Sequence, residues 1–72
     1  MSNIKVRSDV TGSVWKIVTQ AGQMLAAGET IMIIESMKME IPVESPCGGR
    51  IREIRVQEGQ AIEEGAVLAV IE

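Results

Sequence analysis

Short apolar stretches separated by glycine-containing turns run along the whole 72-residue chain. Residues 4–8 alternate apolar and polar side chains, residues 30–34 are almost continuously apolar, and residues 50–56 alternate again. Alternation with a period of two indicates a strand with one buried face, and a short apolar run between turns is typical of a strand buried on both faces. No stretch keeps a helical period long enough to predict a helix. The pattern predicts seven or eight short strands and an all-β fold.

The same order of apolar runs and turns occurs twice, at an offset of 37 residues. Identical pairs are Gly12 with Gly49, Ile17 with Ile54, Gln20 with Gln57, Gly22-Gln23 with Gly59-Gln60, Gly28 with Gly65, and Ile34-Glu35 with Ile71-Glu72. A repeat constrains the fold because both halves must form the same unit. We therefore expect one domain over residues 1–72, with halves at roughly 4–35 and 41–72. Two four-stranded halves are expected to pack face to face as a small sandwich or flattened barrel.

The two halves meet in a Glu-Ser-Met-Lys-Met-Glu sequence centred on Lys38. If residues 30–35 pair with residues 39–43, Met37 and Lys38 form the tip of a hairpin, and the chain ends lie together at the opposite end. A two-residue turn normally takes Asn or Gly because both central residues need positive φ. A turn that breaks this preference is a candidate functional site. Pro42 has no N–H to donate, so residues 41–43 are expected to be an edge strand or the start of a strand.

Composition excludes several classes of function. The formal net charge is -3, and there is no long basic run of the kind a nucleic-acid partner requires. Histidine is absent and Cys47 is the single cysteine, which excludes an internal disulfide, a zinc site and the usual general base. No apolar stretch reaches 18 residues and no signal peptide is evident, so we expect a soluble cytoplasmic domain with no membrane partner. These absences argue against a self-sufficient enzyme.

The Met37-Lys38-Met39 tripeptide between glycine-bounded aliphatic repeats resembles the biotinyl domain of biotin-dependent carboxylases. The resemblance covers roughly Ile4 to Glu72 and extends to the free-standing members called biotin/lipoyl attachment proteins or biotin carboxyl carrier protein subunits. It implies a flattened eight-stranded barrel, or barrel-sandwich hybrid, of two pseudo-two-fold-related halves with the modified lysine on the central hairpin. Larger carrier proteins of acetyl-CoA carboxylase insert a thumb after the second strand. Here Val18 leads directly to the next turn, so the thumb is absent.

The same resemblance implies a function. Lys38 would be biotinylated by a biotin protein ligase, with biotin as the covalent cofactor and lipoate as the alternative. The domain would be a non-catalytic carrier that moves carboxylate between a biotin carboxylase and a carboxyltransferase of an acyl-CoA carboxylase. It is expected to be a monomer when isolated. The acidic neighbours Glu35 and Glu40 favour the ammonium form of the lysine, so the ligase should supply its deprotonation.

Several neighbouring side chains have candidate roles. Met37 and Met39 could be core residues, but soft apolar side chains on either side of a lysine suit recognition by the ligase. Glu35 is a third candidate for ligase recognition. Trp15 is expected to pack on a strand. Ser36 stands where the family more often has alanine, and this exchange of one small residue for another is expected to matter little.

Three other functions remain open from the residues. A lipoyl domain shares the fold and the hairpin lysine, but usually has Asp-Lys followed by a small residue. A structural barrel-sandwich module, like those in membrane-fusion adaptors, has the fold without the modified lysine. A lysine-dependent enzyme would need a buried lysine or a neighbouring cation, and the acidic flanks of Lys38 argue against it.

Overall fold

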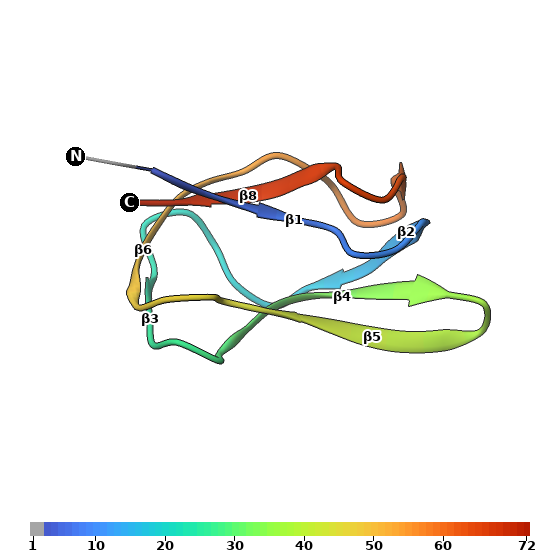
Figure 1. The fold of residues 1–72 in the computed structure, drawn as a ribbon, viewed down its shortest axis with the longest axis horizontal. Helices are drawn as coiled ribbons and strands as arrows, with labels where there is room; N and C mark the ends of the chain where they lie inside the picture. Colours follow the sequence, from blue (N-terminus) through green and yellow to red (C-terminus); the bar gives the residue numbers. More distant parts are fainter. Residues whose placement is uncertain (1–2) are drawn as a thin grey trace.

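A computed structural model describes residues 3–72, and the first two residues of the predicted domain lie outside this range. The described residues form eight strands joined by turns and loops (Figure 1). The strands form two antiparallel four-stranded sheets, with the orders β1-β8-β6-β3 and β5-β4-β2-β7. Their bounds are β1 (Ile4–Arg7), β2 (Gly12–Ile17), β3 (Met24–Leu25), β4 (Thr30–Ser36), β5 (Met39–Glu44), β6 (Gly49–Ile54), β7 (Ala61–Ile62) and β8 (Val67–Ile71). The predicted all-β fold is confirmed. Within residues 3–72 there is no helix with the length and apolar character needed to cross a membrane.

The two halves of the repeat are interleaved between the sheets. β2 and β6 occupy positions 37 residues apart, as do β3 and β7, and each sheet takes two strands from each half. The prediction that each half forms one layer is therefore wrong. Pairing β1 with β8 and β2 with β7 gives strands of one half a hydrogen-bonding partner from the other half. A half folded alone would expose those unpaired backbone groups.

The core lies between the sheets and consists of aliphatic side chains. Its largest fully buried members are Ile31, Met32, Ile34, Ile51, Leu68, Ile71 and Val14. Trp15 is not among them, because 46% of its surface is exposed on the outer side of β2. The pairing of β2 with β4 shifts register between Val14 and Lys16, and Trp15 is the extra residue of that bulge. Trp15 lies on a strand, as predicted, and a bulge interrupts the alternation of inward and outward side chains, which leaves this residue only partly buried.

The β4–β5 hairpin lies at one end of an elongated molecule and the chain ends lie at the other (Figure 1). The molecule measures 35 Å along its long axis and 17 Å across. Ile4 pairs with Ile71, which holds the first and last strands side by side. β5 is an edge strand, and Pro42 lies on it opposite Ile33. Both the placement of the ends and the edge position of Pro42 were predicted.

Candidate functional site

Met37 and Lys38 form the two-residue loop of the β4–β5 hairpin. The register of the hairpin runs from Thr30 opposite Glu44 to Ser36 opposite Met39, which leaves these two residues unpaired. Their φ angles are 53° and 65°. Positive φ at both central residues is the pattern of a type I′ turn, whose twist matches that of the flanking strands. The predicted turn is confirmed, and it places two residues with side chains where Asn or Gly is normally found.

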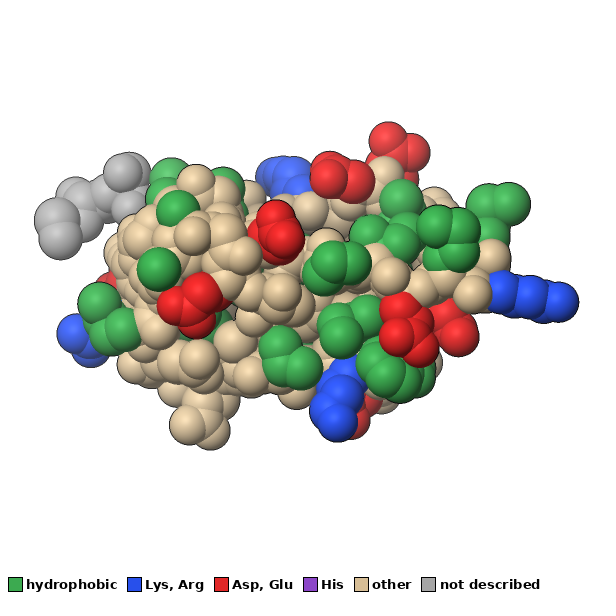
Figure 2. Space-filling view, turned by 90° about the horizontal axis from the view of Figure 1, so that it is seen from below, with side chains coloured by type: hydrophobic (Ala, Val, Ile, Leu, Met, Phe, Trp, Pro, Cys, Tyr) green, Lys and Arg blue, Asp and Glu red, His purple; other side chains and the backbone are tan. Residues whose placement is uncertain are grey.

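The side chains around the turn lie in solvent. Lys38 is exposed, Met37 is 91% exposed and Met39 is 61% exposed. The alternative that these methionines are core residues is therefore wrong. The ion pair found among residues 3–72 joins Arg55 to Glu53 and does not involve Lys38. At the hairpin end of the molecule, Figure 2 shows a basic side chain extending beyond the rest, with hydrophobic and acidic side chains beside it.

Two carboxylates lie on the hairpin stem behind the turn. Glu35 on β4 is directly opposite Glu40 on β5, and both are exposed. Like charges in opposite positions of an antiparallel pair destabilise the ladder slightly. Lys38 has neither the burial nor the neighbouring cation that activates a catalytic lysine. The geometry presents an accessible amine and supplies no base for it.

The hairpin stem is fixed to the loop between β1 and β2. The Ser36 hydroxyl donates a 2.8 Å hydrogen bond to the carbonyl oxygen of Thr11, and the Thr11 hydroxyl accepts one of 3.2 Å from the backbone N–H of Glu64. Gly12 lies so close to the stem that a Cβ there would overlap the carbonyl oxygen of Glu35. Alanine at position 36 could not make the bond to Thr11. The structure therefore gives Ser36 a partner that alanine would lack, and no signal in the sequence indicated it.

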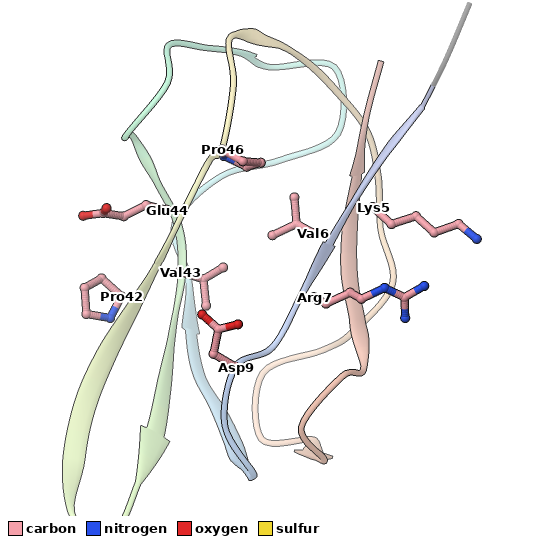
Figure 3. Close-up of a pocket in the computed structure, with 8 residues that line it drawn as sticks. All are labelled: Lys5, Val6, Arg7, Asp9, Pro42, Val43, Glu44 and Pro46. Carbon is pink, nitrogen blue, oxygen red and sulfur yellow. The ribbon is translucent and has the colours of Figure 1, made fainter.

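Apart from the hairpin, a groove of about 460 Å³ lies between the edge strands β1 and β5. Figure 3 shows Val6 and Val43 pointing into the space between these strands, whereas Lys5, Arg7 and Glu44 point away from it. Within residues 3–72, no group of three or more His, Cys, Asp or Glu side chains is placed to hold a metal ion. The groove offers no converging reactive groups, so the hairpin is the candidate site.

Structural comparison defines the class of the fold. The structure superimposes on the urea carboxylase of Kluyveromyces lactis with a TM-score of 0.95 and 33% sequence identity, over 100% of this chain and 6% of that one. It also matches a single-chain, multi-domain long-chain acyl-CoA carboxylase with a TM-score of 0.87 and 26% identity, over 94% of this chain and 7% of that one. The predicted flattened eight-stranded barrel is confirmed. The chain corresponds to one small domain of these much larger enzymes.

Sequence comparison then gives the family. The family described as "Biotin-requiring enzyme" matches residues 2–71, and the chain belongs to it. The biotin/lipoyl attachment protein of Bacillus subtilis is 38% identical over 63 residues, which cover 88% of this chain and 86% of that protein. The biotinylated protein TB7.3 homolog of Mycobacterium leprae is 36% identical over 66 residues, or 92% and 93% of the two chains. An acyl-CoA carboxylase alpha3 subunit of M. leprae is 38% identical over 66 residues, which cover 11% of its length. The chain is thus a biotin carrier domain of the kind found in biotin-dependent carboxylases, and biotin is its cofactor.

Proposed function

We propose that Lys38 is the residue that bears biotin, joined through an amide bond made by a biotin protein ligase. The observation that carries this proposal is an exposed lysine at the tip of a rigidly held two-residue turn, with no ion-pair partner among residues 3–72. The site fits the group because the amine points into solvent and no neighbouring side chain has to move to admit it. Met37, Met39 and Glu35 are proposed to contact the ligase, since all are exposed beside the turn.

The chain's own contribution to the modification is presentation. Glu35 and Glu40 lie opposite each other on the stem, behind the turn that carries Lys38. Nζ needs its lone pair to form the amide bond, so the ligase must accept the proton that this nitrogen loses. The ladder between β4 and β5 and the bond from Ser36 to Thr11 hold the stem against the loop between β1 and β2. A pre-organised hairpin reduces the entropy lost on binding, and this favours recognition by shape.

After modification, the domain is proposed to act as a tether between a biotin carboxylase and a carboxyltransferase. Biotin supplies the ring nitrogen that carries a carboxyl group between the two active sites. The hairpin extends the attachment point beyond the body of the barrel, so that Lys38 can enter a partner's active site (Figure 1). Tethering of this kind gives effective concentrations of the order of mM. The domain itself contributes no catalytic group.

We further propose that the carboxylase served by this carrier is an acyl-CoA carboxylase, acting in the cytoplasm. Similarity to a carrier region within such an enzyme supports the first part. The carrier does not determine which molecule receives the carboxyl group, because the carboxyltransferase binds that molecule. Pyruvate and urea carboxylases contain regions similar to this chain.

The test is the intact mass of the chain after co-expression with a biotin protein ligase and free biotin. We expect a gain of one biotin less one water, and no gain in Lys38→Arg, which keeps the charge but cannot form the amide. Lys16→Arg is the matched control and should still be modified. No gain in the unaltered chain would contradict the proposal. A gain with a lipoyl ligase alone would show that the attached group is lipoate.

A further inference from the structure

The repeat gives the molecule two outer faces with equivalent backbones and opposite charge. On β5, Ile41 and Val43 are half-buried while Glu40, Pro42 and Glu44 are exposed, so these three point outward. The outer side of sheet β5-β4-β2-β7, called the acidic face here, carries Glu35, Glu40 and Glu44 together with Trp15, Lys16 and Pro42. The outer side of sheet β1-β8-β6-β3, called the basic face, carries Lys5, Arg7, Arg50 and Arg52 together with Glu53. Four of the chain's seven Lys and Arg residues are therefore on one face.

Equivalent positions of the repeat carry chemically different side chains on the two faces. Glu44 on the acidic face corresponds to Arg7 on the basic face, at the same offset of 37 residues. Trp15 corresponds to Arg52, and both lie where the pairing of the strand shifts register. The backbone is shared and the side chains are not. Along the equivalent strands, a partner can therefore distinguish the two faces by their side chains.

The acidic face is continuous with the candidate site. Glu35 and Glu40 are on the stem of the hairpin that ends in Met37 and Lys38. Lys16 lies opposite Ile33, four residues before the turn, so Trp15 lies within about 13 Å of the turn at 3.3 Å per residue. An ordinary protein interface covers about 800 Å² on each partner, which is enough to include both. A partner that binds Lys38 can reach Trp15 on the same approach.

Trp15 has the properties of an interface anchor. It is the only aromatic residue of the chain, and 46% of it is exposed. Tryptophan is enriched among the residues that dominate binding energy, because it buries a large apolar area and donates one hydrogen bond. It shares its face with the carboxylates of Glu35, Glu40 and Glu44, and such a surface is complementary to an apolar recess with a basic rim.

We propose that the ligase acting on Lys38 docks on the acidic face, with lysine or arginine side chains facing Glu40 and Glu44 and an apolar recess receiving the indole of Trp15. This inference rests on the proposed function and adds to it a surface that selects the orientation of the partner. The basic face, with the same backbone and opposite charge, is rejected by like-charge repulsion.

The test compares variants of the two faces, among which Trp15 and Arg52 are equivalent positions of the repeat. Trp15→Ala and Glu44→Lys alter the acidic face, while Arg52→Ala and Lys5→Glu alter the basic face. The measurement is the steady-state rate of biotinylation by a biotin protein ligase, at low and at raised salt. We expect about a tenfold loss of kcat/KM for Trp15→Ala, as for a binding hot spot, through KM and with kcat unchanged. Glu44→Lys should lower kcat/KM and flatten its dependence on salt, whereas the basic-face variants should stay within about twofold of the unaltered chain.

Three results would overturn the docking surface. Equal losses on both faces, or no loss on either, would show that the faces are not distinguished. Loss of a self-associated species in both Glu44→Lys and Arg52→Ala would show that a second copy of the chain covers the acidic face. Thermal unfolding of each variant checks that the fold is retained. The unaltered chain must gain biotin in the same experiment, and its failure to do so would contradict the proposed function instead.

Discussion

Met37 and Lys38 hold a backbone conformation that neither residue favours. For L-residues with a Cβ, a left-handed conformation costs roughly 1–2 kcal/mol per residue, and here two consecutive residues adopt it. The turn persists because the ladder behind it pairs Ser36 with Met39 and the stem is bonded to Thr11. Local energetics alone would place Asn or Gly at the tip. The side chains are retained at the expense of local stability, as is typical of functional sites.

Replacing Met37 should separate stability from function. Met37→Asn is expected to stabilise the fold by about 0.5–1 kcal/mol, because Asn tolerates positive φ better than Met. The same change should slow biotinylation, because an exposed apolar side chain beside Lys38 is lost. Urea unfolding and the initial rate of biotinylation measure the two effects. Met24→Asn is the matched control, since Met24 is 64% exposed on β3, away from the hairpin, and the rate should not change. An unaffected rate in Met37→Asn would remove Met37 from the recognition surface.

Residues in this hairpin differed in how far their roles could be predicted. The turn at Met37 and Lys38 follows from pairing residues 30–35 with residues 39–43, because the register of a hairpin fixes the residues of its loop. The hydrogen bond of the Ser36 hydroxyl could not be predicted in this way, because its acceptor is a backbone carbonyl 25 residues away in sequence. The exposure of Trp15 on β2 could not be predicted for a related reason. A register shift in a ladder depends on both strands, and neither strand alone shows it.

At the scale of elements, each half of the repeat brings a glycine at the start of one strand close to the backbone at the end of another. A Cβ on Gly12 would overlap the carbonyl oxygen of Glu35, and a Cβ on Gly49 would lie 2.7 Å from the carbonyl oxygen of Glu72. Both partners are offset by the same 37 residues. Each glycine lets the start of a strand lie against the end of a neighbouring strand. In the first half, that neighbour is the stem of the hairpin.

Gly12→Ala should therefore act on the hairpin as well as on stability. The added methyl group must push the stem at Glu35 and Ser36 away from β2, at a cost of about 1–3 kcal/mol for overpacking. Gly22→Ala provides a control of similar cost, because Gly22 has φ of +91° but no atom within 4 Å of an added Cβ. Chemical denaturation should show a loss of stability in both. Biotinylation, measured where both variants are folded, should slow in Gly12→Ala alone. Equal rates would mean that the stem position does not affect modification.

For the whole molecule, the sheets and the core depend on how the strands of the two halves are interleaved, and not only on the similarity of the halves. The repeat correctly predicted a central hairpin and adjacent chain ends. It could not predict which strands share a sheet, because sequence similarity between halves is the same for separate and for interleaved layers. The observed arrangement pairs β1 with β8 and β2 with β7. It follows that no half contains a complete sheet or a complete core.

Dividing the chain at the hairpin tests this interdependence. Fragments covering residues 1–37 and 38–72 should each lack a cooperative unfolding transition, because each would leave its strands without the partners that the other half provides. An equimolar mixture should recover strand signal in far-ultraviolet circular dichroism, since only the mixture can form both sheets. The intact chain at the same concentration serves as the reference. A fragment that unfolds cooperatively by itself would show that one half is a folding unit. The acceptor lysine would then belong to the junction of two autonomous modules, and not to one barrel built from both.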